Sequence, residues 1–198
     1  SGRNSTAIGF GTTASGDYST AMGESTTASG TYSTAFGRST TASGDESTAF
    51  GRSTMALGDQ STAFGRDTNA SGVFSTAFGR NTTANGNVGT AFGYQTTAEA
   101  YAQTSLGHYN SAHPGTPNAN SITASDRLFV IGNGTSSAAR SDALVILKNG
   151  TTTLNGALTL NPTGTSSYTL PTARGTAGQV LSIDNATTGT TTWTTLSG

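Results

Sequence analysis

The stretch that decides the fold reads Ser33-Thr34-Ala35-Phe36-Gly37, then Arg38-Ser39-Thr40, then Thr41-Ala42-Ser43-Gly44. It consists of two similar halves, and Phe36 of the first half corresponds to Ser43 of the second. The pair of halves recurs every fourteen residues through the first half of the chain. The first half of the repeat therefore carries an apolar side chain at the position where the second half carries a polar one. The repeat is most easily followed by its alanines, at 7, 21, 35, 49, 63, 77 and 91 and at 14, 28, 42, 56, 70, 84 and 98.

The residue types of the repeat exclude a coiled coil, although a period of seven is typical of one. Each half ends in Gly, which costs about 1 kcal/mol relative to Ala at a helical position. Most other positions are Ser or Thr, whose side chains compete with helical hydrogen bonds. Thr and Phe favour strands, whereas Gly with Asp or Asn favours turns. The repeat therefore predicts a solenoid in which each half is a strand of about four residues followed by a turn.

Side chains alternate between the two faces of a strand, so Ala35 points away from Thr34 and Phe36. The alanines of both strands can then meet inside a thin roll, with coils stacked at roughly 4.8 Å. Phe would face outward from one sheet and Ser from the other. The alternative is a thicker roll with Phe inside.

An apolar ladder on the outside of the roll, with one side chain from each coil, implies that another surface covers it. Burying one such side chain contributes about 2 kcal/mol, so the ladder offers roughly 16 kcal/mol per chain before entropy costs. The simplest partner is another copy of the chain. The predicted interface consists of Ile8, Met22, Phe36, Phe50, Phe64, Phe78, Phe92 and Leu106.

Ser33-Thr34-Ala35-Phe36-Gly37 followed by Thr41-Ala42-Ser43-Gly44 resembles the head repeat of YadA-like trimeric autotransporter adhesins, a repeat also used in phage and bacterial surface fibres. The likeness extends from about Ser5 to Ala112. It implies an all-β, left-handed parallel β-roll of fourteen-residue coils, assembled as a homotrimer around the apolar sheets. The chain departs from the family in having Phe where Ile is usual, and Thr6, Thr20 and Thr34 where Val is usual.

The sequence predicts three regions: a β-roll at 1–107, a connector at 108–127 and a smaller β-rich region at 128–198. His113-Pro114-Gly115 marks the connector. Leu128–Gly132 and Ala143–Leu147 are apolar strand candidates, and Asn149-Gly150 signals a hairpin turn after the second.

The last part of the chain contains two further strand candidates, Gln179–Ile183 and Thr190–Thr194, which we expect to pair. The stretch from Leu170-Pro171-Thr172 to Trp193 is similar to modules near the distal ends of phage tail fibres and related bacterial fibres.

Composition narrows the possible functions. The chain has 198 residues, 10% of them charged, and a net charge of −1, which gives no electrostatic case for binding nucleic acid or anionic membrane. It has no cysteine, so disulfides and thiol chemistry are excluded. No apolar run is long enough to span a membrane. Because the sequence starts within a repeat, we expect a segment of a longer protein whose targeting or anchoring regions lie elsewhere.

No residue pattern predicts catalysis, a cofactor or a metal. The two histidines, His108 and His113, have no Cys, Asp or Glu between them, and His108 occupies the same repeat position as Arg80. No Gly-x-Ser-x-Gly elbow precedes a helix, and the glycines follow the fold period rather than a phosphate-loop pattern. The sequence therefore predicts a protein that is not an enzyme.

Four arginines share one position of the repeat and would stack at the coil spacing: Arg38, Arg52, Arg66 and Arg80. They are the candidate ligand patch, a basic stripe for anionic glycans or matrix. The alternative is a solvated turn column that is partly neutralised by acidic neighbours, namely Asp45, Glu46, Asp59 and Asp67.

These features together predict a non-catalytic adhesin or fibre segment on the outside of a cell or virion. The expected partners are two further copies of the chain and a glycan, matrix or cell-surface receptor. The alternatives are a receptor-binding segment of a phage or injection-system tail fibre, and a structural or polymerising fibre subunit without a ligand.

Overall fold

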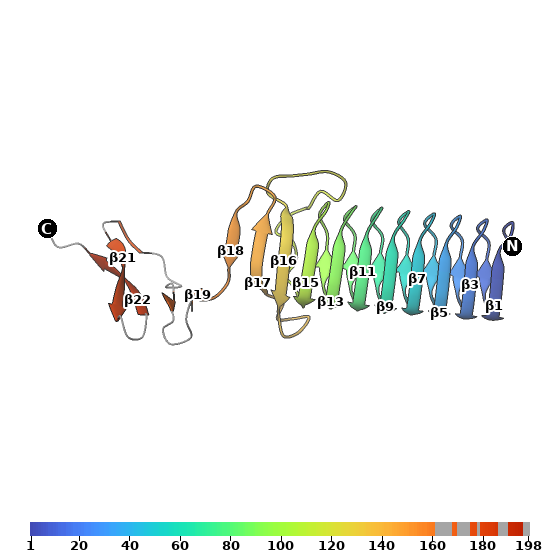
Figure 1. The fold of residues 1–198 in the computed structure, drawn as a ribbon, viewed down its shortest axis with the longest axis horizontal. Coiled ribbons are helices and arrows are strands. Elements are labelled where there is room, and N and C mark those ends of the chain that lie inside the picture. The colour runs from blue at the N-terminus through green and yellow to red at the C-terminus, as the bar shows by residue number, and fades with distance from the viewer. Residues whose placement is uncertain (161–167, 170–174, 178, 186–189, 196–198) are drawn as a thin grey trace. The chain divides into compact units, whose positions relative to one another are not determined.

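The computed structural model describes residues 1–160, 168–169, 175–177, 179–185 and 190–195. The chain forms two compact units, Ser1–Thr153 and Leu154–Gly198. The described residues contain strands and loops but no helix, so the predicted all-β class is confirmed. The predicted parallel solenoid with a coil of fourteen residues is confirmed as well: its coils stand in a row in Figure 1.

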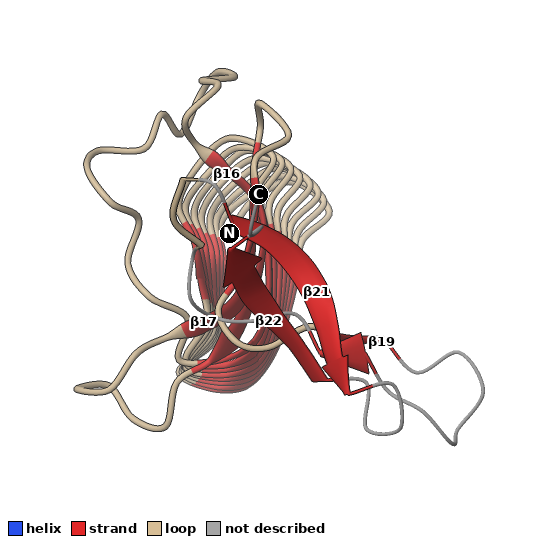
Figure 2. Ribbon diagram, turned by 90° about the vertical axis from the view of Figure 1, so that its left-hand side faces the viewer, coloured by secondary structure: helices blue, strands red, loops and turns tan. Residues whose placement is uncertain are grey.

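Each coil contributes one longer strand to a sheet that we call the long-strand sheet. Its strands pair in parallel and in register, so that each residue lies beside the residue fourteen positions further on, as Phe36 does beside Phe50. Viewed along the row, the coils lie one behind another (Figure 2). The repeat strands of this sheet are β1 (Thr6–Phe10), β3 (Thr20–Glu24), β5 (Thr34–Arg38), β7 (Thr48–Arg52), β9 (Thr62–Arg66), β11 (Thr76–Arg80), β13 (Thr90–Tyr94) and β15 (Thr104–His108).

The second half of each coil forms a parallel short-strand sheet, whose strands are two residues long and not about four as the sequence suggested. The ladder ends early because the turn begins at once: the amides of Ser29 and Gly30 both donate to the carbonyl oxygen of Ala42, at 2.8 and 3.4 Å. The strands are β2 (Thr13–Ala14), β4 (Thr27–Ala28), β6 (Thr41–Ala42), β8 (Met55–Ala56), β10 (Asn69–Ala70), β12 (Thr83–Ala84) and β14 (Thr97–Ala98).

The core between the two sheets is narrow and built from small side chains. The repeat alanines from Ala21 to Ala98 are 0% exposed. The sequence analysis predicted only alanines in the interior. The structure shows two further buried columns at turn positions, one of serines such as Ser33 and one of threonines such as Thr40. Phe lies outside, so the alternative of a thicker roll around Phe is wrong. Two Ala columns with Ser and Thr beside them leave no room for a ring.

Glycine is required at two positions of the coil. Gly37 has φ +130°, and a Cβ there would lie 1.9 Å from the carbonyl oxygen of Gly51 in the next coil. A Cβ on Gly44, in the other turn, would lie 2.1 Å from the carbonyl oxygen of Gly58. These clashes are with backbone, which cannot move aside without opening the stack, so both glycine columns permit the close approach of successive coils.

Residues 109–153 close the end of the roll, and we call them the cap. β16 (Arg127–Asn133) pairs in parallel with β15 and so extends the long-strand sheet. β17 (Asp142–Leu147) follows antiparallel to β16, and β18 (Thr152–Leu154) lies at the edge of the sheet. The turn predicted at Asn149-Gly150 joins β17 to β18, and the amide of Gly150 donates to Leu147 O. The compact unit therefore continues to Thr153, beyond the boundaries expected at 107 and 127.

The second unit contains a small sheet with the order β19-β20-β22-β21. β21 (Gln179–Asn185) and β22 (Thr190–Thr195) pair antiparallel, which confirms the pairing predicted for this part of the chain. The remaining strands are β19 (Thr159–Leu160) and β20 (Tyr168–Thr169). Leu170-Pro171-Thr172, where the predicted distal fibre module begins, lies outside the described residues.

Candidate functional site

A continuous apolar surface is formed by a column of phenylalanines on the outer face of the long-strand sheet. Neighbouring rings stack with centroids 4.9–5.0 Å apart and planes within 5°. The column consists of Phe36, Phe50, Phe64, Phe78 and Phe92, which are 39–48% exposed. Ile8 and Met22 continue it at one end and Leu106 at the other. The structure thus brings all eight predicted interface residues into one line.

The apolar column does not stop where the repeat stops. Strand register places Ile131 beside Leu106 and then Leu144 beside Ile131. In the neighbouring column, where the repeat has threonines, Phe129 lies beside Thr104 and Ile146 lies beside Phe129. The apolar surface is therefore wider on the cap than on the roll. The sequence indicated apolar strands here, but their register with the roll was not predictable because the long connector between β15 and β16 has no repeat pattern.

The arginine column, Arg38, Arg52, Arg66 and Arg80, also lies in register, at the ends of successive long strands. Two of its members have acidic partners: Arg38 Nε lies 3.5 Å from Glu24 Oε2, and Arg66 Nε lies 3.1 Å from Asp67 Oδ2. Arg80 lies over the ring of Tyr94, 5.2 Å from its centroid. Among the described residues, Arg52 and Arg80 have no ion-pair partner.

The other acids that the sequence offered as neutralising partners bond elsewhere. Asp45 Oδ1 accepts from the amide of Thr31 at 2.8 Å, and Asp59 Oδ1 accepts from the amide of Asp45 at 3.0 Å. Glu46 accepts from Gln60 Nε2 at 3.1 Å. These contacts join neighbouring coils at the turn after the short strands, whereas the arginines lie at the ends of the long strands. Of the acids proposed from sequence, only Asp67 pairs with a member of the column.

Two side-chain amides form hydrogen bonds with the backbone groups at the cap end of the roll. Asn110 occupies the slot of the buried threonine column; its Oδ1 accepts from Thr97 N at 2.8 Å and its Nδ2 donates to Thr97 O at 3.0 Å. Gln103 occupies the slot of the buried serine column, and its Oε1 accepts from the amides of Glu99 and Ala100. Each side-chain amide thus supplies the last short strand, or the turn that follows it, with hydrogen-bond partners that the backbone of a further coil would have supplied.

A buried ion pair holds the connector to the cap strands. Arg127 and Asp142 lie 3.1 Å apart with side chains 7% and 3% exposed. Ser111 joins them: its hydroxyl donates to Asp142 and accepts from Arg127 Nη2. The polar groups of this cluster pair with one another through hydrogen bonds and the ion pair, so the cluster has a structural role.

The sequence analysis identified no partner for either histidine, whereas the structure places a carboxylate beside His113 and a carbonyl oxygen beside His108. His113 is buried beside Asp126, with Nε2 3.4 Å from Asp126 Oδ1. His108 is exposed, with Nδ1 2.6 Å from Gly134 O. No spacing rule links His113 to Asp126, since the connector loop brings them together.

Two side chains of the cap have shifted acid–base equilibria. Burial lowers the pKa of Lys148, and the carboxylate of Asp126 opposes that shift. The pKa of Tyr109 is raised, first by its side-chain hydrogen bond with Tyr94 and then by desolvation. The Tyr94 and Tyr109 rings meet edge to face with centroids 5.1 Å apart.

The described part of the chain holds no group of three or more His, Cys, Asp or Glu side chains that could bind a metal ion. It also holds no helix with the length and hydrophobicity needed to cross a membrane.

The comparison with known families agrees with this geometry. The family model described as the YadA head domain repeat matches residues 1–26, 28–54, 56–82 and 70–96. Together with the parallel coils of the same period, the match shows that residues 1–96 carry YadA head repeats, as the residues of the repeat suggested. This family and its β-solenoid are typical of structural, adhesin-type surface fibres. A search of curated proteins found no match to the chain.

Proposed function

We propose that the chain is a segment of a non-catalytic extracellular adhesin or fibre on a cell or virion surface, a rigid homotrimer that displays a surface for attachment to host, matrix or other cells. The observation that carries this proposal is the stacked, exposed phenylalanine column. A soluble single chain rarely exposes a long contiguous apolar patch unless another surface covers it. Because the rings of the column repeat at a constant spacing, another copy of the same column is the natural partner.

The energetics favour assembly only because the column is long. Stacking already covers the faces of the rings, so an exposed fraction near 40% leaves about 80 Å² per ring to bury. At about 25 cal/mol per Å² this contributes about 2 kcal/mol per ring, or roughly 10 kcal/mol for the five rings. Association costs roughly 4–15 kcal/mol. One or two coils would not associate, whereas the full column can.

The subunit number of three and the left-handed coil are taken from the family. In such a trimer the apolar columns would surround the axis, and the wider apolar surface of the cap, with Ile131 and Leu144, would join the same interface. The interface would then extend over both the roll and the cap.

We further propose that attachment uses the arginine column, which lies at the ends of the long strands β5, β7, β9 and β11. The support is geometric: the four guanidinium groups recur at the coil spacing, and Arg52 and Arg80 have no acidic partner in the described residues. A row of cations at regular spacing suits a linear polyanion such as a sulfated polysaccharide, and exposed charges of this kind give binding that weakens as salt rises.

Retention on immobilised heparin tests this proposal. The fourfold variant Arg38→Gln, Arg52→Gln, Arg66→Gln, Arg80→Gln should keep its oligomeric state and elute at much lower salt than wild type. A matched pair refines the assignment: Arg52→Gln with Arg80→Gln should lose more retention than Arg38→Gln with Arg66→Gln. Both double variants change the net charge equally. A difference in their retention would therefore reflect the acidic partners of Arg38 and Arg66, which are Glu24 and Asp67. Unchanged retention in the fourfold variant would remove the column from consideration.

A further inference from the structure

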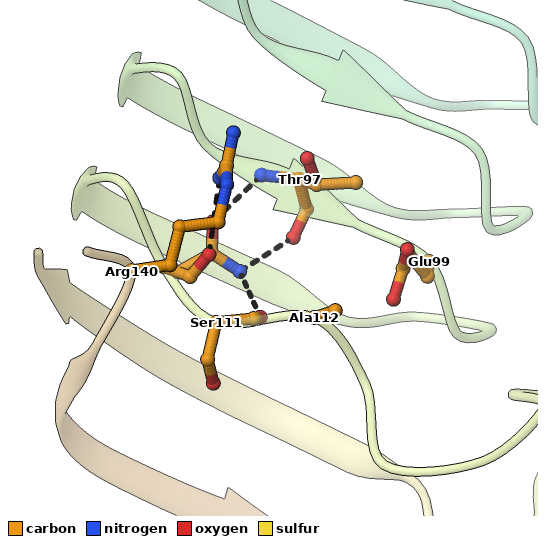
Figure 3. Close-up of a pocket in the computed structure, with 6 residues that line it drawn as sticks. Thr97, Glu99, Ser111, Ala112 and Arg140 are labelled. Atoms are coloured by element: carbon orange, nitrogen blue, oxygen red, sulfur yellow. Dashed lines mark hydrogen bonds between the residues drawn. The ribbon is translucent and has the colours of Figure 1, made fainter. Parts of the chain in front are cut away.

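A small cavity opens where the short-strand sheet ends, and neither the repeat nor the arginine column explains it. Its volume is about 210 Å³, room for about seven water molecules. Figure 3 shows Arg140 and Glu99 on opposite sides of the space, with Ser111 and Ala112 between them. The lining residues are Thr97, Glu99, Asn110, Ser111, Ala112 and Arg140.

The cavity exists because the next short strand is missing. Asn110 supplies the hydrogen bonds for β14, and the chain then leaves the sheet at Ser111. Arg140 enters from the loop between β16 and β17, and its guanidinium donates to Gln95 O at 3.0 Å, Asn110 O at 3.1 Å and Gln95 Oε1 at 3.1 Å. Its guanidinium also lies 5.8 Å from the centroid of the Tyr109 ring. The cation is therefore fixed in place before any ligand arrives.

Several polar groups of the lining remain free. A guanidinium has five N–H donors, and Arg140 uses its Nη1 and Nη2 groups in only three bonds. Glu99 Oε2 accepts from the amide of His113 at 3.0 Å, but Oε1 has no partner among the described residues. The hydroxyl of Thr97 also has none there. Asn110 and Ser111 are fully engaged and serve as walls, and Ala112 adds an exposed methyl group.

This set of free groups defines the chemistry of a ligand. Arg140 offers donors to an anionic group, Glu99 offers an acceptor to hydroxyl groups, Thr97 can do either, and Ala112 suits an apolar ring face. The charged groups stand on opposite sides of the cavity (Figure 3), whose small volume suits a ligand of one ring. We propose that the cavity binds a single carboxylated sugar residue at the end of a glycan, with the carboxylate toward Arg140 and ring hydroxyls toward Glu99.

Two features of the position favour this assignment. The cavity adjoins the short-strand sheet, whereas the phenylalanine column lies on the long-strand sheet, so the cavity stays open when the column is covered. Glu99 is the one carboxylate in its repeat position, which is otherwise Ser15, Ser29, Ser43, Leu57, Ser71 and Asn85. The proposal deepens the attachment function proposed above, but it does not depend on the arginine column.

Saturation-transfer NMR with methyl β-glucuronide tests the site on the whole chain. We expect a signal from the glucuronide, binding of methyl β-glucoside that is weaker by about tenfold or more because Arg140 loses an ionic partner, and none from glycine. Glu99→Gln keeps an acceptor for the amide of His113 but loses the charge, and it should weaken binding several-fold. Ala112→Trp should fill the cavity and abolish binding, whereas the control Ala124→Trp, at an exposed connector site, should bind as wild type does.

Three results would overturn the proposal: no glucuronide signal at millimolar concentration, a signal that survives Ala112→Trp, or glycine binding as well as the glucuronide, which would indicate a site for zwitterions. A failure of the proposal for the arginine column can be distinguished from a failure of the proposal for the cavity. The variant Arg52→Gln with Arg80→Gln should keep glucuronide binding whatever its retention on heparin, and Ala112→Trp should keep heparin retention.

Discussion

At the scale of single residues, the thickness of the roll is set by what fits between the two sheets. Each interior alanine lies directly between the alanines of the coils before and after it, as Ala56 does between Ala42 and Ala70. The neighbouring threonines are buried too, but their hydroxyls have no hydrogen-bond partner in the described structure, as at Thr54 Oγ1. The methyl groups of these threonines thus contribute packing, while their hydroxyls carry a desolvation cost.

The substitution Ala56→Leu should destabilise the roll by about 1–3 kcal/mol, because the added isopropyl group has no space in a fully buried site. The matched substitution Thr54→Val keeps the shape and removes the unpaired hydroxyl, so it should be neutral or stabilising. Thermal unfolding of the two variants beside wild type measures both effects. An Ala56→Leu protein that melts at the wild-type temperature would show that Ala56 does not point inward.

At the scale of strands and sheets, the important question is how a stack of identical coils ends. A sheet edge that finishes without partners exposes backbone donors and acceptors to further pairing. Here the long-strand sheet is continued by β16, β17 and β18, and the last short strand is closed by the Asn110 amide. The connector then crosses the turns, where the amides of Asn87 and Tyr101 donate to Ala119 O and Asn118 O.

Replacing Asn110 by Leu, whose side chain has the same branching, should cost about 2–4 kcal/mol because Thr97 N and Thr97 O would lose their partners. Asn85→Leu is the control, since Asn85 directly follows the short strand β12, is exposed, and has a side chain that accepts from the Ser71 hydroxyl rather than from a backbone amide. Hydrogen exchange at the Thr97 amide gives a local readout beside global unfolding in urea. If that amide stayed as protected in Asn110→Leu as in wild type, the proposed role of Asn110 as an edge cap would be wrong.

The repeat and the cap differ in how far their sequence predicts their structure. Inside the repeat, every residue has copies fourteen positions away, so the environment of Phe50 or Ala49 follows from the alternation of a strand and the period of the coil. The strand pair Gln179–Ile183 and Thr190–Thr194 was also predictable, because it is local.

The cap and the cavity depend on contacts between residues distant in the sequence. Nothing in the residues before Arg127 indicates that β16 will continue the sheet, or that Arg140 will reach Gln95. The early end of the short strands was also missed, since it follows from a carbonyl shared by two amides rather than from residue preference.

At the scale of the whole molecule, the thin interior and the exposed phenylalanines are two consequences of one sequence pattern. Alanine inside permits the close approach of the two sheets, and the larger apolar side chains of the repeat, the phenylalanines, lie outside and partly exposed. Isolated coils with so small a core gain little from burial, so the outer column should supply much of the stability through assembly. Stability should accordingly depend on protein concentration.

Native mass spectrometry of the chain at micromolar concentration is the most direct test of this self-association. Wild type should appear as three chains of 19.8 kDa, about 59 kDa, and the variant Phe50→Asp with Phe64→Asp should appear as single chains or aggregates. The charged side chains would have to be buried without partners in the trimer. A wild-type protein that is a stable 19.8 kDa monomer at that concentration would contradict assembly through the phenylalanine column.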